Sequence, residues 1–436
     1  MLRYLAHAVR DLSPSAATAL PAFSISPAGA DAGRHQSRSK ELPMRLKSAL
    51  SLGLSLAALA FAPALVHAQA VPQSPATADP DHITYGRDAE NIKDQIAGYN
   101  ALLKDGENGL SVYQNTTGVM YTPISPADQV AGMGAGVNLF EGDDAYWSGR
   151  TGNFNDSDIK AIADAGLKTI RVPLFAFAHI VDAQGNLDPA YLAKLDHLID
   201  LATANHLNII LDEHNYTECA KDVDGCGVLL SNVWYDLALR YQTAPSNVIF
   251  EILNEPNGNL DKDIWNGWLP DLVAQVRQFD PSRNIIIGPT MWNSPDQLDT
   301  LKLPADDHII VTFHYYTPME FTHQGANWAG PELEKMSGVR WTGTADQVAV
   351  IDGTFDKVKA WSTANNRPIF LGEFGSYAKV NKNLDDRAAW TRAVSKAASD
   401  RGFARALWVY EGSQGFGIHD AGKGWVAPLR DALVNP

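Results

Sequence analysis

The sequence predicts a (β/α)₈ barrel preceded by an N-terminal extension. Three observations predict this fold. Eight short apolar segments recur from residue 134 onward, amphipathic segments lie between them, and the starts of the first and last apolar segments, 134 and 404, give a mean step of about 39 residues. Near-continuous apolar strands that alternate with helices indicate a parallel sheet buried on both faces. Eight such units fit a closed barrel of about 250 residues or more.

The N-terminal part predicts a processed leader. Residues 1–43 are polar and rich in Pro, Ser and Ala, and we expect a disordered leader or a misassigned start in front of Met44. Residues 44–68 combine a short basic start, an uncharged Leu/Ala run and small residues around a cleavage point, which is typical of a secretory signal peptide. Pro63 interrupts a run that is already short for a membrane span. We therefore expect a secreted or periplasmic protein without membrane contact after cleavage.

The next segment, 69–127, is an N-terminal extension of the mature chain to which the sequence assigns no role. Its first part is rich in Pro, Ala and Asp, residues 88–104 fit a helix, and residues 105–127 look irregular. The segment is poor in Trp, unlike a carbohydrate-binding module. The barrel itself is expected over 128–436.

The barrel elements follow in order from the hydrophobic pattern. Strands are expected at 134–139, 168–173, 207–212, 247–253, 284–288, 308–313, 368–371 and 404–409. Helices are expected at 156–165, 189–205, 231–241, 264–279, 354–365 and 384–400, and the interval 295–304 gives the weakest helix. The alternative is a doubly wound open sheet, which usually has a Gly-rich phosphate turn after its first strand. The Gly-rich stretch 132–137 lies before and within that strand, so it does not support this alternative.

Composition excludes several functional classes. The chain has 35 Lys+Arg against 50 Asp+Glu, a net charge of −15, which argues against nucleic-acid binding and leaves uncharged partners open. Its two cysteines are too few for a disulfide scaffold or a cysteine zinc site. Cys219 and Cys226 lie seven residues apart in a loop-like stretch, where an exported protein is expected to form a local disulfide.

Polar residues gather where the expected strands end, and barrel enzymes hold their chemistry at that edge. Glu255 and Glu373 follow strands four and seven, which lie nearly opposite each other. Paired carboxylates that flank a bond are what glycoside hydrolysis requires, one protonated and the other ionised. A single strand-end Glu is more often a solvated carboxylate or an arginine partner, so the neighbours matter. They are Asn138, Arg171, His214, Asn215, Asn254, Trp292, His314, Tyr316, Trp408 and Glu411.

Several neighbours have roles that fit a sugar substrate. Asn254 could hydrogen-bond a 2-hydroxyl, and Arg171 could hold Glu373 ionised by direct pairing. His314 and Tyr316 could orient the two carboxylates, and Trp408 offers a flat face for a pyranose ring. Trp292 and Trp328 are expected to stack on further sugar rings.

These motifs together resemble glycoside hydrolase family 5. Asn254-Glu255-Pro256 and Gly372-Glu373-Phe374-Gly375 carry the resemblance, with Ile170-Arg171-Val-Pro173, His214-Asn215-Tyr216 and His314-Tyr-Tyr316 in the same order. The resemblance covers roughly residues 131–430 and implies a double displacement with retention. Glu255 would be the acid/base and Glu373 the nucleophile, supported by Arg171, His214, Asn254, His314, Tyr316 and Trp408. It implies no metal or organic cofactor.

The resemblance predicts an endo-1,4-β-glucanase acting on cellulose-type or mixed-linkage glucan. A β-mannanase or a xyloglucanase on the same scaffold remains the alternative, because the long stretch between strands six and seven can reshape the cleft. A non-catalytic carbohydrate-binding barrel is a third reading, but it predicts the loss of a carboxylate and both are present. The sequence predicts no oligomeric state.

Overall fold

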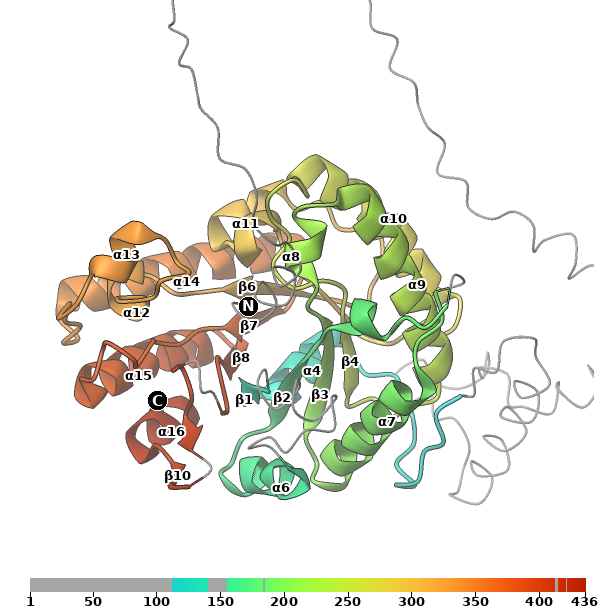
Figure 1. Cartoon of the computed structure of the whole chain (residues 1–436), viewed down its shortest axis with the longest axis horizontal. Helices are drawn as coiled ribbons and strands as arrows, with labels where there is room; N and C mark the ends of the chain where they lie inside the picture. The colour runs from blue at the N-terminus through green and yellow to red at the C-terminus, as the bar shows by residue number, and fades with distance from the viewer. Residues whose placement is uncertain (1–111, 140–154, 183–184, 412–414, 421) are drawn as a thin grey trace, which may run out of the picture. The chain divides into compact units, whose positions relative to one another are not determined.

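The computed structural model describes residues 112–139, 155–182, 185–411, 415–420 and 422–436. The expectations for residues 1–43, 44–68 and most of 69–127 lie outside these ranges. Within them, eight parallel strands form a closed barrel in sequence order, and β1 completes it by pairing with β8 (Figure 1). The predicted (β/α)₈ fold is therefore confirmed.

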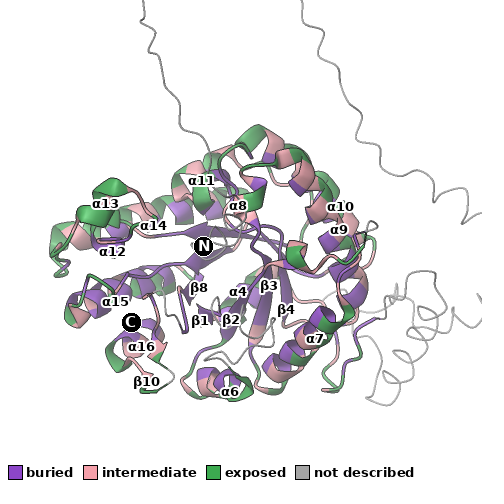
Figure 2. Cartoon of the chain, viewed as in Figure 1, coloured by how far each residue is buried: buried purple, intermediate pink, exposed green. Residues whose placement is uncertain are grey.

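The strands begin within one residue of the predicted positions. All their residues are buried except the half-buried Asn208, and the barrel wall is accordingly purple in Figure 2. This explains why each strand is nearly continuously apolar in sequence. The strands are β1 (Ala135–Asn138), β2 (Thr169–Leu174), β3 (Asn208–Glu213), β4 (Val248–Glu251), β5 (Ile285–Ile287), β6 (Ile309–His314), β7 (Ile369–Glu373) and β8 (Ala404–Leu407).

Helices surround the barrel in the order that the sequence predicts (Figure 1). The long ones are α6 (Asp156–Asp164), α7 (Pro189–Ala204), α9 (Val223–Tyr241), α10 (Lys262–Arg277), α14 (Ala345–Asn365) and α15 (Leu384–Asp400), followed by α16 (Ala427–Val434). Shorter segments occupy the loops: η1 (Ala176–His179), α8 (Tyr216–Cys219), α11 (Thr290–Asn293), η2 (Pro295–Thr300), α12 (Met319–Thr322) and α13 (Pro331–Lys335), and β9 (His419–Asp420) pairs with β10 (Gly424–Trp425). None of the helices in the described ranges has the length and apolar character that crossing a bilayer demands.

Two helices start earlier than predicted because caps, and not apolar periodicity, set their first residues. The Asp222 side chain accepts a hydrogen bond from the Gly225 N–H at the start of α9. Thr344 and Gln347 form a reciprocal capping box at the start of α14. The cysteine stretch, expected to be loop-like, is consequently helical: Cys219 ends α8 and Cys226 lies in the first turn of α9.

The inside of the barrel is filled by apolar side chains and closed by a helix before β1. This helix, α4 (Pro126–Met133), contributes Val130 and Met133. They pack with inward-facing residues from six strands: Ile210, Ile249, Ile286, Ile310, Phe370, Ala404 and Ala406. The barrel is therefore a packed core and not a pore, so polar chemistry is confined to its ends.

The described end of the extension lies against the barrel. The Tyr113 N–H donates to the Arg240 carbonyl at 2.9 Å, and the Tyr121 hydroxyl donates to Asp280 at 3.0 Å. Both tyrosines are buried. Residues 112–125 contain no helix or strand, yet they are packed onto the fold.

Candidate active site

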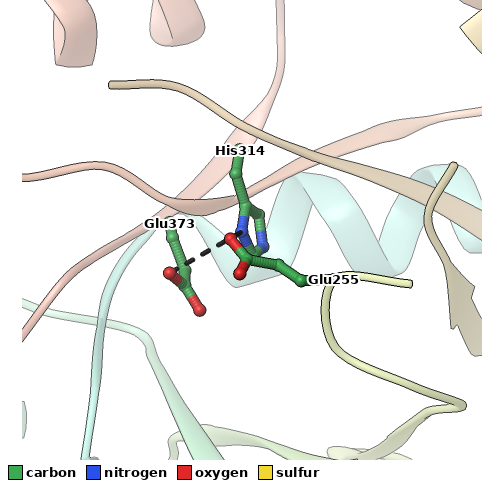
Figure 3. Close-up of side chains that lie close together, drawn as sticks. All are labelled: Glu255, His314 and Glu373. Atoms are coloured by element: carbon green, nitrogen blue, oxygen red, sulfur yellow. Dashed lines mark hydrogen bonds and ion pairs between the residues drawn. The ribbon is translucent and has the colours of Figure 1, made fainter. Parts of the chain in front are cut away.

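The two carboxylates lie at the carboxyl edge of the barrel on opposite strands. Glu373 is the last residue of β7, and Glu255 follows four residues after the end of β4. Figure 3 shows their side chains converging on either side of His314, the last residue of β6. Glu255 has a left-handed backbone conformation, φ 44°. The Asn257 side-chain amide, donating to the Glu255 carbonyl at 2.8 Å, supports this conformation.

His314 bridges the pair. Its Nδ1 lies 2.7 Å from Glu255 Oε1 and 3.6 Å from Glu373 Oε2. Oxygen atoms of the two carboxylates lie within 4.8 Å of each other. That separation is close to the roughly 5–5.5 Å of retaining glycosidases and well below the 6.5–9.5 Å of inverting ones. The geometry thus suits direct attack by one carboxylate.

Glu373 is held by two donors. Its Oε1 accepts from Arg171 Nη1 at 3.0 Å, and its Oε2 accepts from the Tyr316 hydroxyl at 2.9 Å. Burial raises the pKa of Glu373 above its usual value, and the charge of Arg171 acts in the opposite direction. A carboxylate held rigidly by two donors is oriented for nucleophilic attack.

Glu255 has a different environment. Burial raises the pKa of Glu255 to about 8, against the lowering effect of Arg171. This carboxyl group is therefore protonated at neutral pH, which a general acid requires. Burial also lowers the pKa of His314 to about 4, so the imidazole between the two carboxylates is neutral.

Arg171 lies fully buried beneath the carboxylates and organises the polar residues around it. Glu251 accepts two of its hydrogen bonds, at 2.7 and 2.9 Å, and Asp212 lies 3.0 Å from Nη2. Asn138 and Asn254 each accept from the guanidinium at 2.8 Å.

Glu251 and Asp212 are not among the predicted site residues. A charged residue inside an otherwise apolar strand was the available signal, and the two are register partners on β3 and β4.

His214 and Asn254 orient each other. His214 Nδ1 lies 2.6 Å from Asp212 Oδ2, and its Nε2 lies 3.3 Å from Asn254 Nδ2. Because Asn254 Oδ1 accepts from Arg171, its NH₂ group points away from the guanidinium. The His214 ring also stacks on Trp408 with centroids 5.8 Å apart. These contacts fix an amide donor and an aromatic face beside the two carboxylates.

The remaining predicted residues do not contact the carboxylates. Asn215 accepts from the Phe177 N–H at 3.2 Å, and Glu411 pairs with His419 at 3.2 Å. Trp292 and Trp328 are 49% and 48% exposed, as a sugar platform requires. Trp341, in the segment before α14, is buried in the outer core.

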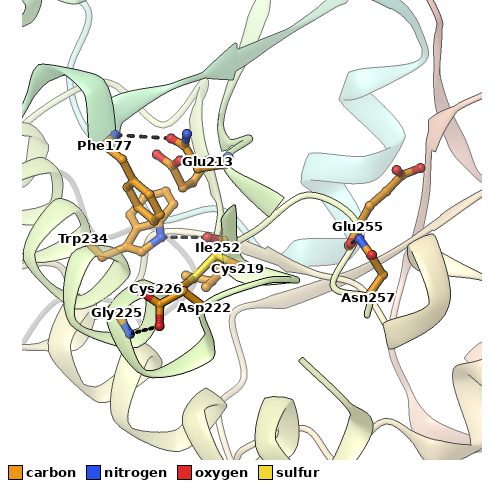
Figure 4. Close-up of a disulfide and its surroundings, with 11 residues drawn as sticks. Phe177, Glu213, Cys219, Asp222, Gly225, Cys226, Trp234, Ile252, Glu255 and Asn257 are labelled. Carbon is orange, nitrogen blue, oxygen red and sulfur yellow. Dashed lines mark hydrogen bonds between the residues drawn. A yellow bond between two sulfur atoms is a disulfide. The ribbon is translucent and has the colours of Figure 1, made fainter. Parts of the chain in front are cut away.

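A disulfide joins Cys219 and Cys226 beside the site (Figure 4). Both cysteines are buried. The adjoining Ala220 carbonyl accepts from the Asn259 N–H at 3.0 Å, and Asn259 belongs to the loop that follows Glu255. The disulfide therefore joins α8 to α9, and the neighbouring backbone hydrogen bond joins this pair to the loop that carries the acid/base candidate.

Comparisons with known proteins agree with this geometry. The family described as cellulase (glycosyl hydrolase family 5) matches residues 129–414. Endoglucanase H of Acetivibrio thermocellus is 31% identical over 293 residues, which are 65% of this chain and 30% of that protein's length. This chain therefore corresponds to less than a third of that relative. Cellodextrinase A of Ruminococcus flavefaciens is 25% identical over 275 residues, covering 61% of this chain and 81% of that protein.

Solved structures give the same result. Endoglucanase Cel5A of Thermotoga maritima is 32% identical with a TM-score of 0.66, covering 71% of this chain and all of that one. Its structures with mannotriose and with cellobiose each match at 31% identity and a TM-score of 0.65, covering 71% of this chain and 99% of that one. The matched region contains both strand-end carboxylates and the residues that hold them, and this chain therefore belongs to glycosyl hydrolase family 5, the cellulase family.

Proposed function

We propose that this protein is a retaining endo-β-1,4-glucanase that acts on cellulose-type or mixed-linkage glucan. The observation that carries the proposal is the pair Glu255 and Glu373, whose oxygens lie within 4.8 Å of each other across His314. Endoglucanases among the relatives and structural neighbours support the same substrate class. The surrounding donors and aromatic faces suit an uncharged sugar chain.

The reaction proceeds in two displacements. Glu373 attacks the anomeric carbon while Glu255 gives its proton to the glycosidic oxygen, and the bond to the leaving sugar breaks. Glu255, now ionised, removes a proton from a water molecule, which attacks the same carbon and releases Glu373. Two inversions give net retention. Asn254 is placed to hydrogen-bond a hydroxyl of the reacting sugar, and Trp408 to stack on its ring.

The direct test is the anomeric form of the first product. Proton NMR during hydrolysis of barley β-glucan should show the β-anomer first, followed by slow mutarotation. Initial formation of the α-anomer would contradict the double displacement. A fall in viscosity of carboxymethyl cellulose that precedes most of the reducing-sugar release would distinguish internal cleavage from cleavage at chain ends.

Mannan is a second candidate substrate, because Thermotoga maritima Cel5A has been solved with mannotriose. Initial rates on β-glucan, mannan, xyloglucan and xylan decide between them. Higher kcat/KM on mannan than on β-glucan would overturn the glucanase assignment and retain the glycosidase mechanism.

We also propose that the protein is exported. The basic start, the apolar run and the small residues of 44–68 support this, as does the disulfide, since disulfides persist in oxidising compartments. N-terminal sequencing of the protein from the culture medium or periplasm should find a start shortly after residue 68. Retention of the full chain in the cytoplasm would overturn the proposal.

A further inference from the structure

The cluster of Glu255, His314 and Glu373 has the composition of a metal site as well as of a catalytic one. Across the described part of the chain, it is the one group of histidine and carboxylate ligands whose donor atoms all lie within 4.8 Å of one another. Figure 3 shows the three side chains pointing at a common centre. One nitrogen and two carboxylate oxygens from three different strands or strand ends therefore face a single point.

The spacing is close to that of a small divalent ion, although the two carboxylate oxygens, which lie within 4.8 Å of each other, must come within about 4.4 Å to share an ion at 2.2 Å. Zinc binds nitrogen and carboxylate oxygen at about 2.0–2.2 Å, so two ligands at a tetrahedral angle lie about 3.4 Å apart. The 3.6 Å between His314 Nδ1 and Glu373 Oε2 already agrees with this spacing. The 2.7 Å between Nδ1 and Glu255 Oε1 must open by less than about 1 Å. The Glu255 side chain is 14% exposed, more than its two partners, and lies beyond the end of β4.

Asn293 lies where it can stabilise the tautomer of His314 that binds a metal through Nδ1. A metal on Nδ1 requires the ring hydrogen to be on Nε2, which lies 3.3 Å from Asn293 Nδ2. Asn293 is fully buried, and its Oδ1 has no hydrogen-bond partner among the described residues. A half-turn of this amide places Oδ1 at Nε2, where it accepts the hydrogen.

The backbone holds Asn293 in this position despite its conformational cost. Met291, Trp292 and Asn293 have φ values of 58°, 60° and 53°, which side chains larger than glycine rarely adopt. The Trp292 N–H donates to the Pro256 carbonyl at 3.3 Å, which connects this turn to the residue after Glu255. The amide that can stabilise the metal-binding tautomer is thus fixed to the same loop as the ligand.

We propose that Glu255, Glu373 and His314 Nδ1 form an inhibitory binding site for a divalent transition-metal ion, Zn²⁺ or Cu²⁺, in the substrate-free enzyme. Imidazole and carboxylate together suit these ions, whereas Mg²⁺ and Ca²⁺ prefer more oxygen ligands. Competition from thiolates is absent because the two cysteines of the chain form the disulfide. The ion occupies the space between the two carboxylates, where the anomeric carbon reacts, so metal and substrate exclude each other.

Calorimetric titration of the EDTA-treated protein with ZnCl₂ tests the site directly. One ion per chain should bind, and saturating cellobiose should weaken the binding. Glu255→Gln and Glu373→Gln are nearly isosteric and should each lower the affinity at least about tenfold, because each removes one anionic ligand. MgCl₂ should give no binding at the same concentrations.

His197→Gln is the matched control. His197 pairs with Asp156 at 2.8 Å on the exposed surface, which makes it the kind of group that binds zinc adventitiously. This variant should bind zinc as the wild type does. Zinc affinity unchanged in both carboxylate variants, or lost in His197→Gln, would overturn the proposed site.

Kinetics gives an independent readout. On an aryl β-cellobioside, added Zn²⁺ should raise KM and leave kcat unchanged, and EDTA should reverse the effect. A fall in kcat at constant KM would contradict mutual exclusion.

The outcome is separable from the proposed glucanase function. If zinc binding disappears in Glu373→Gln and the wild-type protein is inactive on every glucan, only the proposed glucanase function is rejected. Full glucanase activity with carboxylate-independent zinc binding rejects only the metal site.

Discussion

At the residue scale, the two carboxylates proposed to carry catalysis are distinguished by the groups around them. Glu373 accepts from a guanidinium and a phenol, whereas Glu255 contacts a neutral imidazole. The two donors favour the ionised form of Glu373, whereas burial keeps Glu255 protonated. The sequence predicts the positions of the two glutamates and their order along the chain. It does not predict which of them is protonated, because the protonation state depends on burial and contacts.

The division of roles predicts different responses to azide. Glu255→Ala and Glu373→Ala should each lower kcat on β-glucan by about 10²–10⁴-fold or more, since each removes one half of the mechanism. With an activated aryl β-cellobioside, azide should rescue Glu255→Ala with formation of the β-glycosyl azide. In Glu373→Ala, azide replaces the nucleophile and should give the α-product. Exchange of these two products would reverse the assignment.

The pKa shifts predict a bell-shaped pH profile. Glu255 must be protonated to act, and its pKa of about 8 predicts that kcat/KM falls above about pH 8. Glu373 must be ionised, and its raised pKa predicts an acidic limb above the usual carboxyl range. In Glu255→Gln, measured with an activated leaving group, the basic limb should disappear. A basic limb that persists unchanged in this variant assigns it to another group.

The buried arginine predicts unequal losses of stability. Arg171 faces Glu251, Asp212 and Glu373, so Glu251→Gln leaves the guanidinium with two carboxyl partners. Arg171→Gln leaves the three carboxylates without this cation. We expect Arg171→Gln to lower the free energy of unfolding by about 3–5 kcal/mol and Glu251→Gln by less. Urea unfolding measures the loss of free energy of unfolding in both variants. An equal loss would mean that Arg171 is not shared among Glu251, Asp212 and Glu373.

At the scale of elements, the sequence predicts strands better than helix starts. A strand buried on both faces carries its signal in its own residues, as the isoleucines of β5 do. The first turns of α9 and α14 carry little apolar periodicity and depend on single capping residues. The left-handed turn at α11 has no Gly to announce it, because its conformation is imposed by tertiary contacts.

The disulfide between α8 and α9 is expected to stabilise the folded protein. Its cysteines are seven residues apart, so the chain-entropy relation predicts about 2–3 kcal/mol of stabilisation. The double variant Cys219→Ser/Cys226→Ser should lose about this much free energy of unfolding in urea. Reductant should destabilise the wild type to a similar extent and leave the double variant unchanged. Reductant sensitivity of the double variant would show that another cause is at work.

At the scale of the whole molecule, the closed barrel brings together residues that are far apart in the chain. Arg171 and Glu373 are 202 positions apart and joined by a hydrogen bond. The sequence predicts this convergence once the strand order is known, because all eight strands end at one edge. It does not predict Glu251 as an Arg171 partner, since that depends on the registers of β2 with β3 and of β3 with β4.

The net charge of −15 predicts a salt effect that depends on the substrate. An acidic protein repels an anionic polymer, and salt screens this repulsion as the Debye length falls from about 30 Å at 0.01 M to about 8 Å at 0.15 M. On carboxymethyl cellulose, kcat/KM should therefore rise with NaCl over this range. On uncharged barley β-glucan, assayed with the same enzyme as control, it should stay constant. A parallel rise on both substrates would mean that salt acts on the protein itself. A rise on the anionic polymer alone would show that the acidic surface disfavours charged polysaccharides and leaves the binding of neutral ones unaffected.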